Sequence, residues 1–439
     1  MTAQHLYEPT DGKYLDAADA RAERDRTFNI CSDCRLCVRL CPSFKSLFRM
    51  VDEREEADHA DAVTGLSDAE HQRVVDECYQ CKLCYVVCPY TPDQQQEWVV
   101  DFPRLMLRSL VIQGEEGKVQ RGARLLARTD LQGKVATTLS PVVNKMNEVG
   151  FARGLMEKAT GIAKDRLVPT FAKVRFSKWF RRRAAGATTA RAADTPDRGA
   201  VGMFPTCLVE YQQPAIGKAM VGVYERNGFT CELPEGQVCC GMPWLDAGDT
   251  KKFREHAQTN VDRLLPAVEA GHDVVVPQPT CAYVIKNEYG DFLGTDEARR
   301  VAEHTYDASE YLMNRHREQP LDTEFDGTTY ESILWQAACH YRAQQIGPKS
   351  RDLMALTGAK VAMVERCSAI DGTWGLRAEN VEMAKQVAKP LMEKVRESDA
   401  QLIAGDCQLS NTAIFEQTAK QPVHPLQVLA RAYGLEEEG

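Results

Sequence analysis

The sequence predicts a multidomain α+β protein, in which an α-helical N-terminal domain precedes a duplicated α/β module. Three observations support this prediction. Two cysteine runs of identical spacing lie near the N-terminus and are separated by a charged stretch with helical periodicity. A strongly basic segment follows them. From residue 200 onward, short apolar runs that end in cysteine recur in two successive halves.

Composition narrows the class of protein. The chain has 439 residues, of which 44% are hydrophobic, so it is long enough for two or three domains with their own cores. Its net charge of −9 argues against a general nucleic-acid-binding protein. We find neither a secretory leader nor a run of about 18 apolar residues, and we expect a cytoplasmic protein. Because the cytosol keeps thiols reduced, the 16 cysteines indicate metal ligation rather than disulfides.

Both cysteine runs, "CSDCRLCVRLCP" and "CYQCKLCYVVCP", have the spacing C-x2-C-x2-C-x3-C-P. Three thiolates at this spacing surround one face of an iron-sulfur cubane, and the fourth, redirected by the proline, reaches the neighbouring cluster. We therefore predict two [4Fe-4S] clusters, one bound by Cys31, Cys34, Cys37 and Cys88 and the other by Cys41, Cys78, Cys81 and Cys84. Two zinc sites are the alternative, but these use pairs of C-x2-C rather than triplets followed by C-P.

The residues between the two runs, 43–77, are charged and helical in pattern rather than a short β-hairpin. This favours an α-helical ferredoxin domain over residues 1–110, as in the iron-sulfur subunits of respiratory dehydrogenases.

Residues 111–199 are expected to form a basic helical connector and a linker. Between Lys118 and Arg191, seventeen lysines and arginines stand against four acidic residues, and "RFSKWFRRR" at 175–183 interleaves aromatic and cationic side chains. Such a helix can lie in the headgroup region of an anionic membrane, so peripheral contact with the inner face of the cell membrane is one hypothesis. A solvated connector, or one that docks on an acidic neighbour, is the alternative. The small, polar residues 184–200 are typical of a linker.

A repeat begins at residue 200, and we assign its halves to residues 200–325 and 326–439. The cysteines of the two halves correspond at offsets of 132, 128 and 126 residues, which pair Cys207 with Cys339, Cys239 with Cys367, and Cys281 with Cys407. Each half reads as strand, cysteine, helix, strand, cysteine loop, helix, strand and cysteine, which predicts a small α/β unit. Its cysteines follow strands, at the edge of a parallel sheet where ligands bind.

Two ferredoxin-type runs followed by two such halves resemble the CCG-domain iron-sulfur oxidoreductases. This family includes the C subunit of anaerobic glycerol-3-phosphate dehydrogenase, the iron-sulfur subunit of glycolate oxidase and the catalytic subunits of heterodisulfide reductase. The resemblance covers most of residues 25–435. The stretches "VDFPRLMLRS", "ERCSAIDGTWG" and "GDC" are most similar to a branch encoded beside rubrerythrin, a peroxide-reducing di-iron protein.

The resemblance implies one or two further iron-sulfur clusters, or zinc, in the CCG module. In the first half the implied ligands are Cys207, Cys239, Cys240 and Cys281, which would make a closed site. Val284 stands where the family pattern has a further cysteine, which argues against the five-thiolate noncubane cluster of heterodisulfide reductase.

The second half retains three of these cysteines, because Ser368 and Ser410 stand at the other positions. The implied site has Cys339, Cys367 and Cys407 as ligands and one open position, which His340, Asp371, a substrate or solvent could occupy. Cys231 has no counterpart in the repeat and is expected to be a buried structural thiol.

The resemblance implies an electron-transfer subunit that passes electrons through two [4Fe-4S] clusters to a metal site in the CCG module and on to a quinone or a protein acceptor. The alternative is a catalytic subunit that reduces a disulfide or peroxide-linked substrate at an open iron. The sequence has no dinucleotide fingerprint or flavin motif. A flavoprotein dehydrogenase or a rubrerythrin-like protein is therefore the expected redox partner.

Protein isolated without oxygen should contain at least about eight irons per chain, because the two cysteine runs alone supply the ligands of two cubanes. Iron, sulfide and zinc analysis provides the measurement. A saturated preparation with about four irons and two zincs would contradict the assignment.

Overall fold

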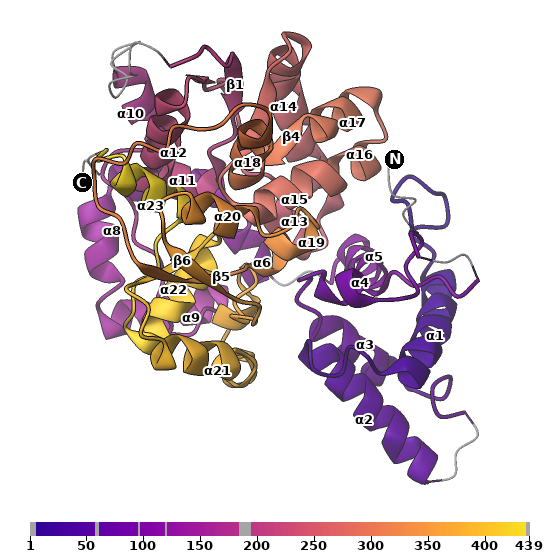
Figure 1. Cartoon of the computed structure of the whole chain (residues 1–439). Helices are drawn as coiled ribbons and strands as arrows, with labels where there is room; N and C mark the ends of the chain where they lie inside the picture. The colour runs from indigo at the N-terminus through magenta and orange to yellow at the C-terminus, as the bar shows by residue number, and fades with distance from the viewer. Residues whose placement is uncertain (1–5, 58–60, 95–96, 119–120, 184–194, 436–439) are drawn as a thin grey trace.

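The computed structural model of the chain describes residues 6–57, 61–94, 97–118, 121–183 and 195–435. Figure 1 shows an N-terminal domain, drawn in indigo, that projects from a larger body formed by the later segments. The larger body contains two sheets covered by helices, so the mixed α and β class is confirmed. Most of the predicted linker, residues 184–194, lies outside the described residues.

Five helices make up the described part of the N-terminal domain: α1 (Ala17–Cys34), α2 (Pro42–Glu56), α3 (Asp68–Asp76), α4 (Leu83–Val87) and α5 (Phe102–Glu115). Local sequence fixes their ends. The side chain of Asp16 caps α1, and Ser67 and Glu70 form a capping box at α3. Pro42, from the first C-P pair, occupies the first turn of α2, where its missing N–H is not needed. The expected helical stretch between the cysteine runs is therefore α2 and α3.

The basic segment forms five more helices, α6 (Arg121–Leu126), α7 (Thr129–Thr138), α8 (Ser140–Met146), α9 (Gly150–Thr160) and α10 (Phe176–Arg182). These helices pack on the larger body. Gly133 of α7 lies so close to the Tyr211 ring that an added Cβ would approach it to 2.3 Å. Farther along, buried Arg166 pairs with Glu416 at 3.0 Å. The expected connector is thus an integral layer of the body rather than a free spacer.

The position of α10 argues against the membrane hypothesis for "RFSKWFRRR". Phe176 is fully buried, and Trp179 and Phe180 pack against the same hydrophobic core. Arg183 is 2.7 Å from Glu225, which is also buried. The aromatic side chains that a membrane contact requires therefore face inward, and docking on acidic neighbours is the better description of α10. None of the described helices is both long enough and apolar enough to cross a membrane.

The first half of the repeat contains a four-stranded parallel sheet of order β2-β1-β3-β4. Its strands are β1 (Ala200–Met203), β2 (Thr230–Glu232), β3 (Asp273–Val276) and β4 (Thr305–Asp307). Its helices are α11 (Thr206–Tyr211), α12 (Pro214–Arg226), α13 (Met242–Asp246), α14 (Thr250–Glu269), α15 (Pro279–Asn287), α16 (Tyr289–Leu293), α17 (Asp296–Glu303) and α18 (Ala308–Glu318). The central strands β1 and β3 are apolar and buried, as expected for parallel strands covered on both faces.

The second half contains a three-stranded parallel sheet of order β6-β5-β7. Its strands are β5 (Ser332–Gln336), β6 (Lys360–Val364) and β7 (Leu402–Gly405). Its helices are α19 (Cys339–Ala343), α20 (Lys349–Ala355), the 3-10 helix η1 (Trp374–Leu376), α21 (Val381–Glu397), α22 (Gln408–Thr418) and α23 (Pro425–Ala432). In both sheets the first strand is flanked by the second and third. Val201 of β1 and Trp335 of β5 lie in one hydrophobic core, so the halves are packed together.

Buried charges join the N-terminal domain to the first half. Arg104 of α5 is 2.7 Å from Asp291 and 3.5 Å from Glu288. Lys82, between two cysteines of the second run, is 3.8 Å from Glu288. Lys82, Arg104 and Glu288 are almost entirely buried, so they compensate one another's charge without help from water.

Replacing Arg104 with Met should lower the stability of the protein by about 3 kcal/mol, because the acidic partners keep their buried charge without compensation. The exposed pair of Arg299 and Asp296, 2.8 Å apart, supplies the control, since Arg299→Ala should cost less than about 1 kcal/mol. Thermal unfolding of the cluster-loaded proteins measures both effects. Equal shifts in Tm would show that the buried charges do not hold the domains together.

Candidate metal centres

The sixteen cysteines fall into four groups and one separate thiol, and we name the groups sites 1 to 4. Site 1 contains Cys31, Cys34, Cys37 and Cys88, which line a single pocket with Phe44 and Phe48. Cys88 reaches this pocket from the second cysteine run, as the spacing predicts. Burial, together with the thiols of Cys88 and Cys34, raises the pKa of Cys37 to about 12.

Site 2 contains Cys41, Cys78, Cys81 and Cys84. Burial raises the pKa of Cys84 well above its usual range, and the thiols of Cys81, Cys37, Cys78 and Cys41 add to the shift. Because Cys37 belongs to site 1, the two sites are neighbours. Arg35 and Lys82 follow the second cysteine of their runs, and both have left-handed backbones with φ of 52° and 62°. This shared turn redirects the chain towards the third cysteine of each run.

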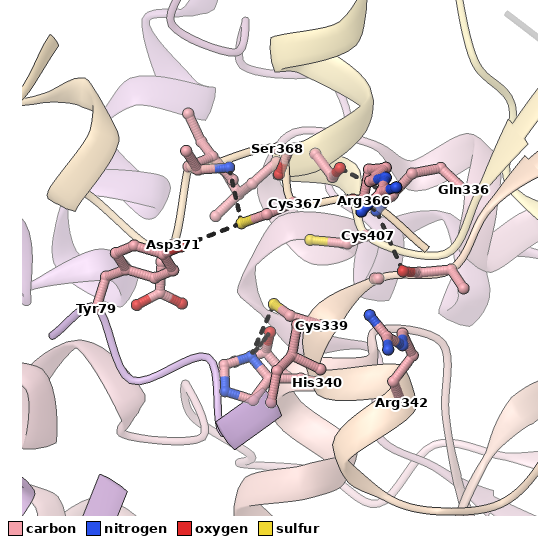
Figure 2. A pocket seen from close by; sticks show the side chains of 18 of the residues that line it. Tyr79, Gln336, Cys339, His340, Arg342, Arg366, Cys367, Ser368, Asp371 and Cys407 are labelled. Atoms are coloured by element: carbon pink, nitrogen blue, oxygen red, sulfur yellow. Dashed lines mark hydrogen bonds between the residues drawn. The ribbon is translucent and has the colours of Figure 1, made fainter. Parts of the chain in front are cut away.

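Site 3 contains Cys339, Cys367 and Cys407, which follow β5, β6 and β7. Figure 2 shows the three sulfur atoms facing one pocket, with His340 and Asp371 beside them. Ligand atoms of Cys339, His340 and Asp371 lie within 4.8 Å of one another. Ser410, at the position of a missing cysteine, donates its hydroxyl to Gln336 at 2.9 Å instead.

His340 is held on both ring nitrogens. Nε2 lies 3.1 Å from the carbonyl oxygen of Gln80, and Nδ1 lies 3.1 Å from the hydroxyl of Thr280. Burial lowers the pKa of His340 to about 3, so the ring is neutral and donates from one nitrogen only. The ring therefore bridges the N-terminal domain and the first half. The ligand role expected for His340 stays a prediction, because a ring nitrogen also lies within 4.8 Å of the ligand atoms of Cys339 and Asp371. In contrast, no described side chain pairs with the carboxylate of Asp371, which Figure 2 shows directed towards the pocket.

Site 4 contains Cys207, Cys239, Cys240 and Cys281, which follow β1, β2 and β3. The thiol of Cys239 contacts those of Cys207 and Cys240, and Cys240 contacts Cys281. Hydrogen bonds from Cys207 and Cys240 hold the pKa of Cys239 below its usual range, which favours a thiolate in the middle of the group. Val284 is fully buried in α15 and supplies no fifth ligand. The separate thiol, Cys231, lies buried in β2.

The loop "QVCCGMPW" is fixed by its glycine and by the groups behind it. Gly241 has a φ of 91°, and a Cβ there would meet the Phe253 ring at 2.7 Å, so glycine alone fits without rearrangement. Tyr289 donates its hydroxyl to the carbonyl oxygen of Cys240 at 3.0 Å. Asn260 donates to the carbonyl oxygen of Cys239 at 3.2 Å. These contacts hold two adjacent thiols in a defined direction.

Asp130 is a residue of site 4 that the sequence prediction missed. Its carboxylate accepts a hydrogen bond from the backbone N–H of Cys239 at 2.8 Å and from the hydroxyl of Tyr211 at 3.2 Å. Burial raises the pKa of Asp130. The sequence offers one signal that could have identified Asp130: it is one of only four acidic residues between Lys118 and Arg191.

Sites 3 and 4 differ in access. The pocket at site 3 has a volume of about 30 Å³ and is covered by Tyr79, whose hydroxyl lies 3.5 Å from the sulfur of Cys367. A pocket of about 550 Å³ reaches Cys207 and Cys239 at site 4. The expectation of a closed first half and an open second half concerns the number of ligands rather than access, so it stays a prediction.

Comparison with known proteins places this geometry in a family. Residues 30–93 match the 4Fe-4S dicluster domain family, and residues 201–286 match the cysteine-rich CCG domain family. The C subunit of anaerobic glycerol-3-phosphate dehydrogenase from Escherichia coli (strain K12) is 27% identical over 317 residues, which are 70% of this chain and 76% of the relative. The chain resembles the CCG-domain iron-sulfur oxidoreductases. Lactate utilization protein A from Bacillus pumilus (strain SAFR-032) is 29% identical over 218 residues, or 47% of this chain and 87% of the relative.

In this CCG-domain protein the matched regions coincide with the thiol sites. The dicluster match contains all ligands predicted for sites 1 and 2, and the CCG match contains all four thiols of site 4. Each of these sites gathers four thiols, which is a donor set suited to an iron-sulfur cluster.

Thr206, just before Cys207, is the strained residue of site 4. Its φ of 72° lies in the left-handed region, which a β-branched residue rarely adopts. The side chain is buried and lines the pocket beside Cys207. Strain of this kind is retained mainly at functional sites, where the surroundings enforce it.

Thr206→Gly should raise the stability of the protein by about 1 kcal/mol, because glycine adopts positive φ without strain. The control is Thr230→Gly in β2, where the same change should lower stability by about 1 kcal/mol. Thermal unfolding distinguishes the two signs. A lower Tm for Thr206→Gly would show that the backbone of Thr206 is not strained.

Proposed function

We propose that the protein is an iron-sulfur electron-transfer subunit of an oxidoreductase. Sites 1 and 2 would hold [4Fe-4S] clusters, and sites 3 and 4 would hold further iron-sulfur clusters. When bound, such clusters supply one-electron transfer without large rearrangement. The observation that carries the proposal is that site 1 neighbours site 2, site 2 neighbours site 3 and site 3 is joined to site 4, which has the widest of the pockets at these sites in the described part of the chain.

Interactions between neighbouring sites support this order. The thiol of Cys37 in site 1 contributes to the raised pKa of Cys84 in site 2. Burial, followed by the thiols of Cys339 and Cys367 in site 3, raises the pKa of Cys81 in site 2. We infer that electrons pass along the order 1, 2, 3 and 4 or the reverse.

Sites 3 and 4 are joined through residues beside their ligands. His340 follows Cys339, and Thr280 precedes Cys281. The hydrogen bond between His340 and Thr280 therefore links the two sites, because each of these residues is next to a ligand cysteine in the chain. No solvent layer separates these side chains, since His340 is buried.

At site 3 we assign Cys339, Cys367, Cys407 and Asp371 as the ligands and His340 as a bridge. The backbone N–H of Ala369 donates to the sulfur of Cys367 at 3.2 Å, and Tyr79 lies on its other side. Hydrogen bonds to a ligand sulfur stabilise the reduced, more negative state of a cluster. These groups would therefore raise the reduction potential of site 3 and exclude water from it.

Site 1 is the proposed contact with a redox partner protein. Leu36 lines its pocket and is more than half exposed, and Val38 and Val87 adjoin its ligands Cys37 and Cys88. Trp98 is also exposed and packs near Tyr90, another residue of this pocket. An exposed apolar rim of this kind is typical of a protein-binding surface. A flavoprotein dehydrogenase or a rubrerythrin-like protein would dock here.

Site 4 is the proposed contact with the second redox partner, a quinone or a protein. Its wide pocket is bounded by Phe180, Tyr211 and Leu233, which offer an apolar wall beside Cys207.

The same pocket supports a second candidate function, the reduction of a disulfide or peroxide-linked substrate at site 4. A volume of about 550 Å³ is in the range of small-molecule sites. In this candidate a donor protein at site 1 supplies two electrons, which together with two protons cleave the S–S or O–O bond of the substrate at site 4. Turnover then needs no acceptor protein, which distinguishes this candidate from the electron-transfer subunit.

Cys367→Ser and Cys240→Ser test the order of the sites. With a small reduced ferredoxin as the donor, Cys367→Ser should leave sites 1 and 2 reducible while site 4 stays oxidised. Cys240→Ser should damage site 4 and leave sites 1 to 3 reducible. Freeze-quench Mössbauer and EPR spectroscopy follow each site.

Cys231→Ala is the matched control, because Cys231 lines the wide pocket but is not one of the grouped thiols, so the change should leave the reduction of all four sites unchanged. If site 4 of Cys367→Ser is reduced at the parent rate, site 3 does not lie between sites 2 and 4.

A further inference from the structure

Three consecutive helices of the larger body point polar side chains inward and apolar side chains outward. In α7 the inward residue is Asp130, which binds Tyr211 and the backbone of Cys239. The outward residues, Leu131 and Val135, are four positions apart and each more than half exposed. Residues with this spacing lie on one side of a helix, so α7 presents an apolar stripe to the outside.

The next two helices repeat the pattern. In α8, Asn144 exchanges two hydrogen bonds of 2.9 Å with the backbone of Phe171, while Val142 and Met146 are exposed. An amphipathic helix on the surface of a soluble protein normally directs its apolar side chains to the core and its polar side chains to solvent.

The arrangement of polar side chains inward and apolar side chains outward is clearest in α9. Arg153 is only 5% exposed and donates to the carbonyl oxygens of Ala163, Lys164 and Arg166, while Phe151 is 78% exposed. Leu155, one turn after Phe151, is also more than half exposed.

We name this surface the α7–α9 face. It consists of eight exposed side chains, two of which, Leu139 and Val149, lie between the helices: Leu131, Val135, Leu139, Val142, Met146, Val149, Phe151 and Leu155. Isolated exposed apolar residues need no explanation, but eight of them on three successive helices and the turns between them indicate a contact surface.

The surroundings of the face are cationic. Lys134, Lys145 and Lys158 stand on the same three helices and are exposed. The segment from Lys118 to Arg191 carries seventeen basic and four acidic residues, although the whole chain has a net charge of −9. The rest of the molecule is thus strongly acidic, and the positive charge is concentrated where the apolar side chains are exposed.

We propose that the α7–α9 face docks on the surface of an anionic membrane. Phe151, Leu155 and the other apolar side chains would enter the boundary between headgroups and acyl chains, while the lysines bind anionic headgroups. Helices with this combination of an apolar stripe and lysines lie in the plane of the interface, so docking requires no spanning helix.

The location of the face suits this role. Figure 1 shows α8 at the edge of the larger body that lies away from α1–α3. Docking therefore leaves the N-terminal domain free. Lys134 of α7 also lines the pocket at site 4, so the docked protein holds that pocket next to the lipid surface.

Vesicle sedimentation with the full, cluster-loaded chain tests the proposal. The parent should bind vesicles of phosphatidylglycerol and phosphatidylethanolamine, bind neutral phosphatidylcholine vesicles far less, and dissociate as salt is raised. Phe151→Ser with Leu155→Ser should weaken binding at least about tenfold. Replacing Lys134, Lys145 and Lys158 with Ser should weaken it about fivefold per lysine.

Met363→Ser with Phe415→Ser is the matched control, because these exposed apolar residues lie in the second half of the repeat. This control should bind vesicles like the parent, and iron content should be unchanged in every variant. No electron donor or acceptor is present, so the result is independent of the proposed redox function.

Two outcomes would overturn the proposal. One is a parent protein that does not bind anionic vesicles. The other is sedimentation velocity showing that the parent forms a dimer that the Phe151 and Leu155 changes dissociate, while vesicle binding is unaltered. The face would then be an interface between two copies of this chain.

Discussion

The structure depends on thiols that are gathered in buried sites, where burial opposes the loss of their protons. At sites 1 to 3, desolvation raises the pKa of ligand cysteines such as Cys31, Cys81 and Cys339. A metal ion or cluster reverses this balance, because its positive charge stabilises the thiolate. In the proposed cluster-loaded protein, metal binding would therefore be coupled to the packing of the surrounding turns.

The parts of the fold that were predictable from the sequence are those set by local spacing. The C-x2-C-x2-C-x3-C-P pattern predicts which thiols meet at sites 1 and 2, including the exchange of Cys41 and Cys88 between runs. Apolar runs ending in cysteine predict the strands β1, β3, β5 and β7. In both cases, the information lies within about a dozen residues, over which backbone geometry restricts the possible structures.

The parts that were not predictable arise from packing between distant segments. The pattern of α10 does not reveal that Phe176 fills a core built from β1 and β5. The same limit hides the bridging contacts of His340 from the sequence. Its two partners, Gln80 and Thr280, are 260 and 60 residues away. The outward direction of Phe151 likewise depends on Arg153 having carbonyl partners in the following loop.

The attachment of the N-terminal domain bears on the proposed electron transfer between sites 2 and 3. Trp374 donates to the carbonyl oxygen of Asp76 at 3.0 Å, His340 contacts the carbonyl oxygen of Gln80, and Arg104 is buried among acidic residues of the first half. Proteins whose redox domains swing on a tether wait for a diffusive encounter, and their rates fall as solvent viscosity rises. Here buried contacts hold the thiols of sites 2 and 3 in a fixed arrangement. In the proposed function, the step between these sites would therefore be insensitive to viscosity, and its rate would be set by driving force and by the medium between the sulfur atoms.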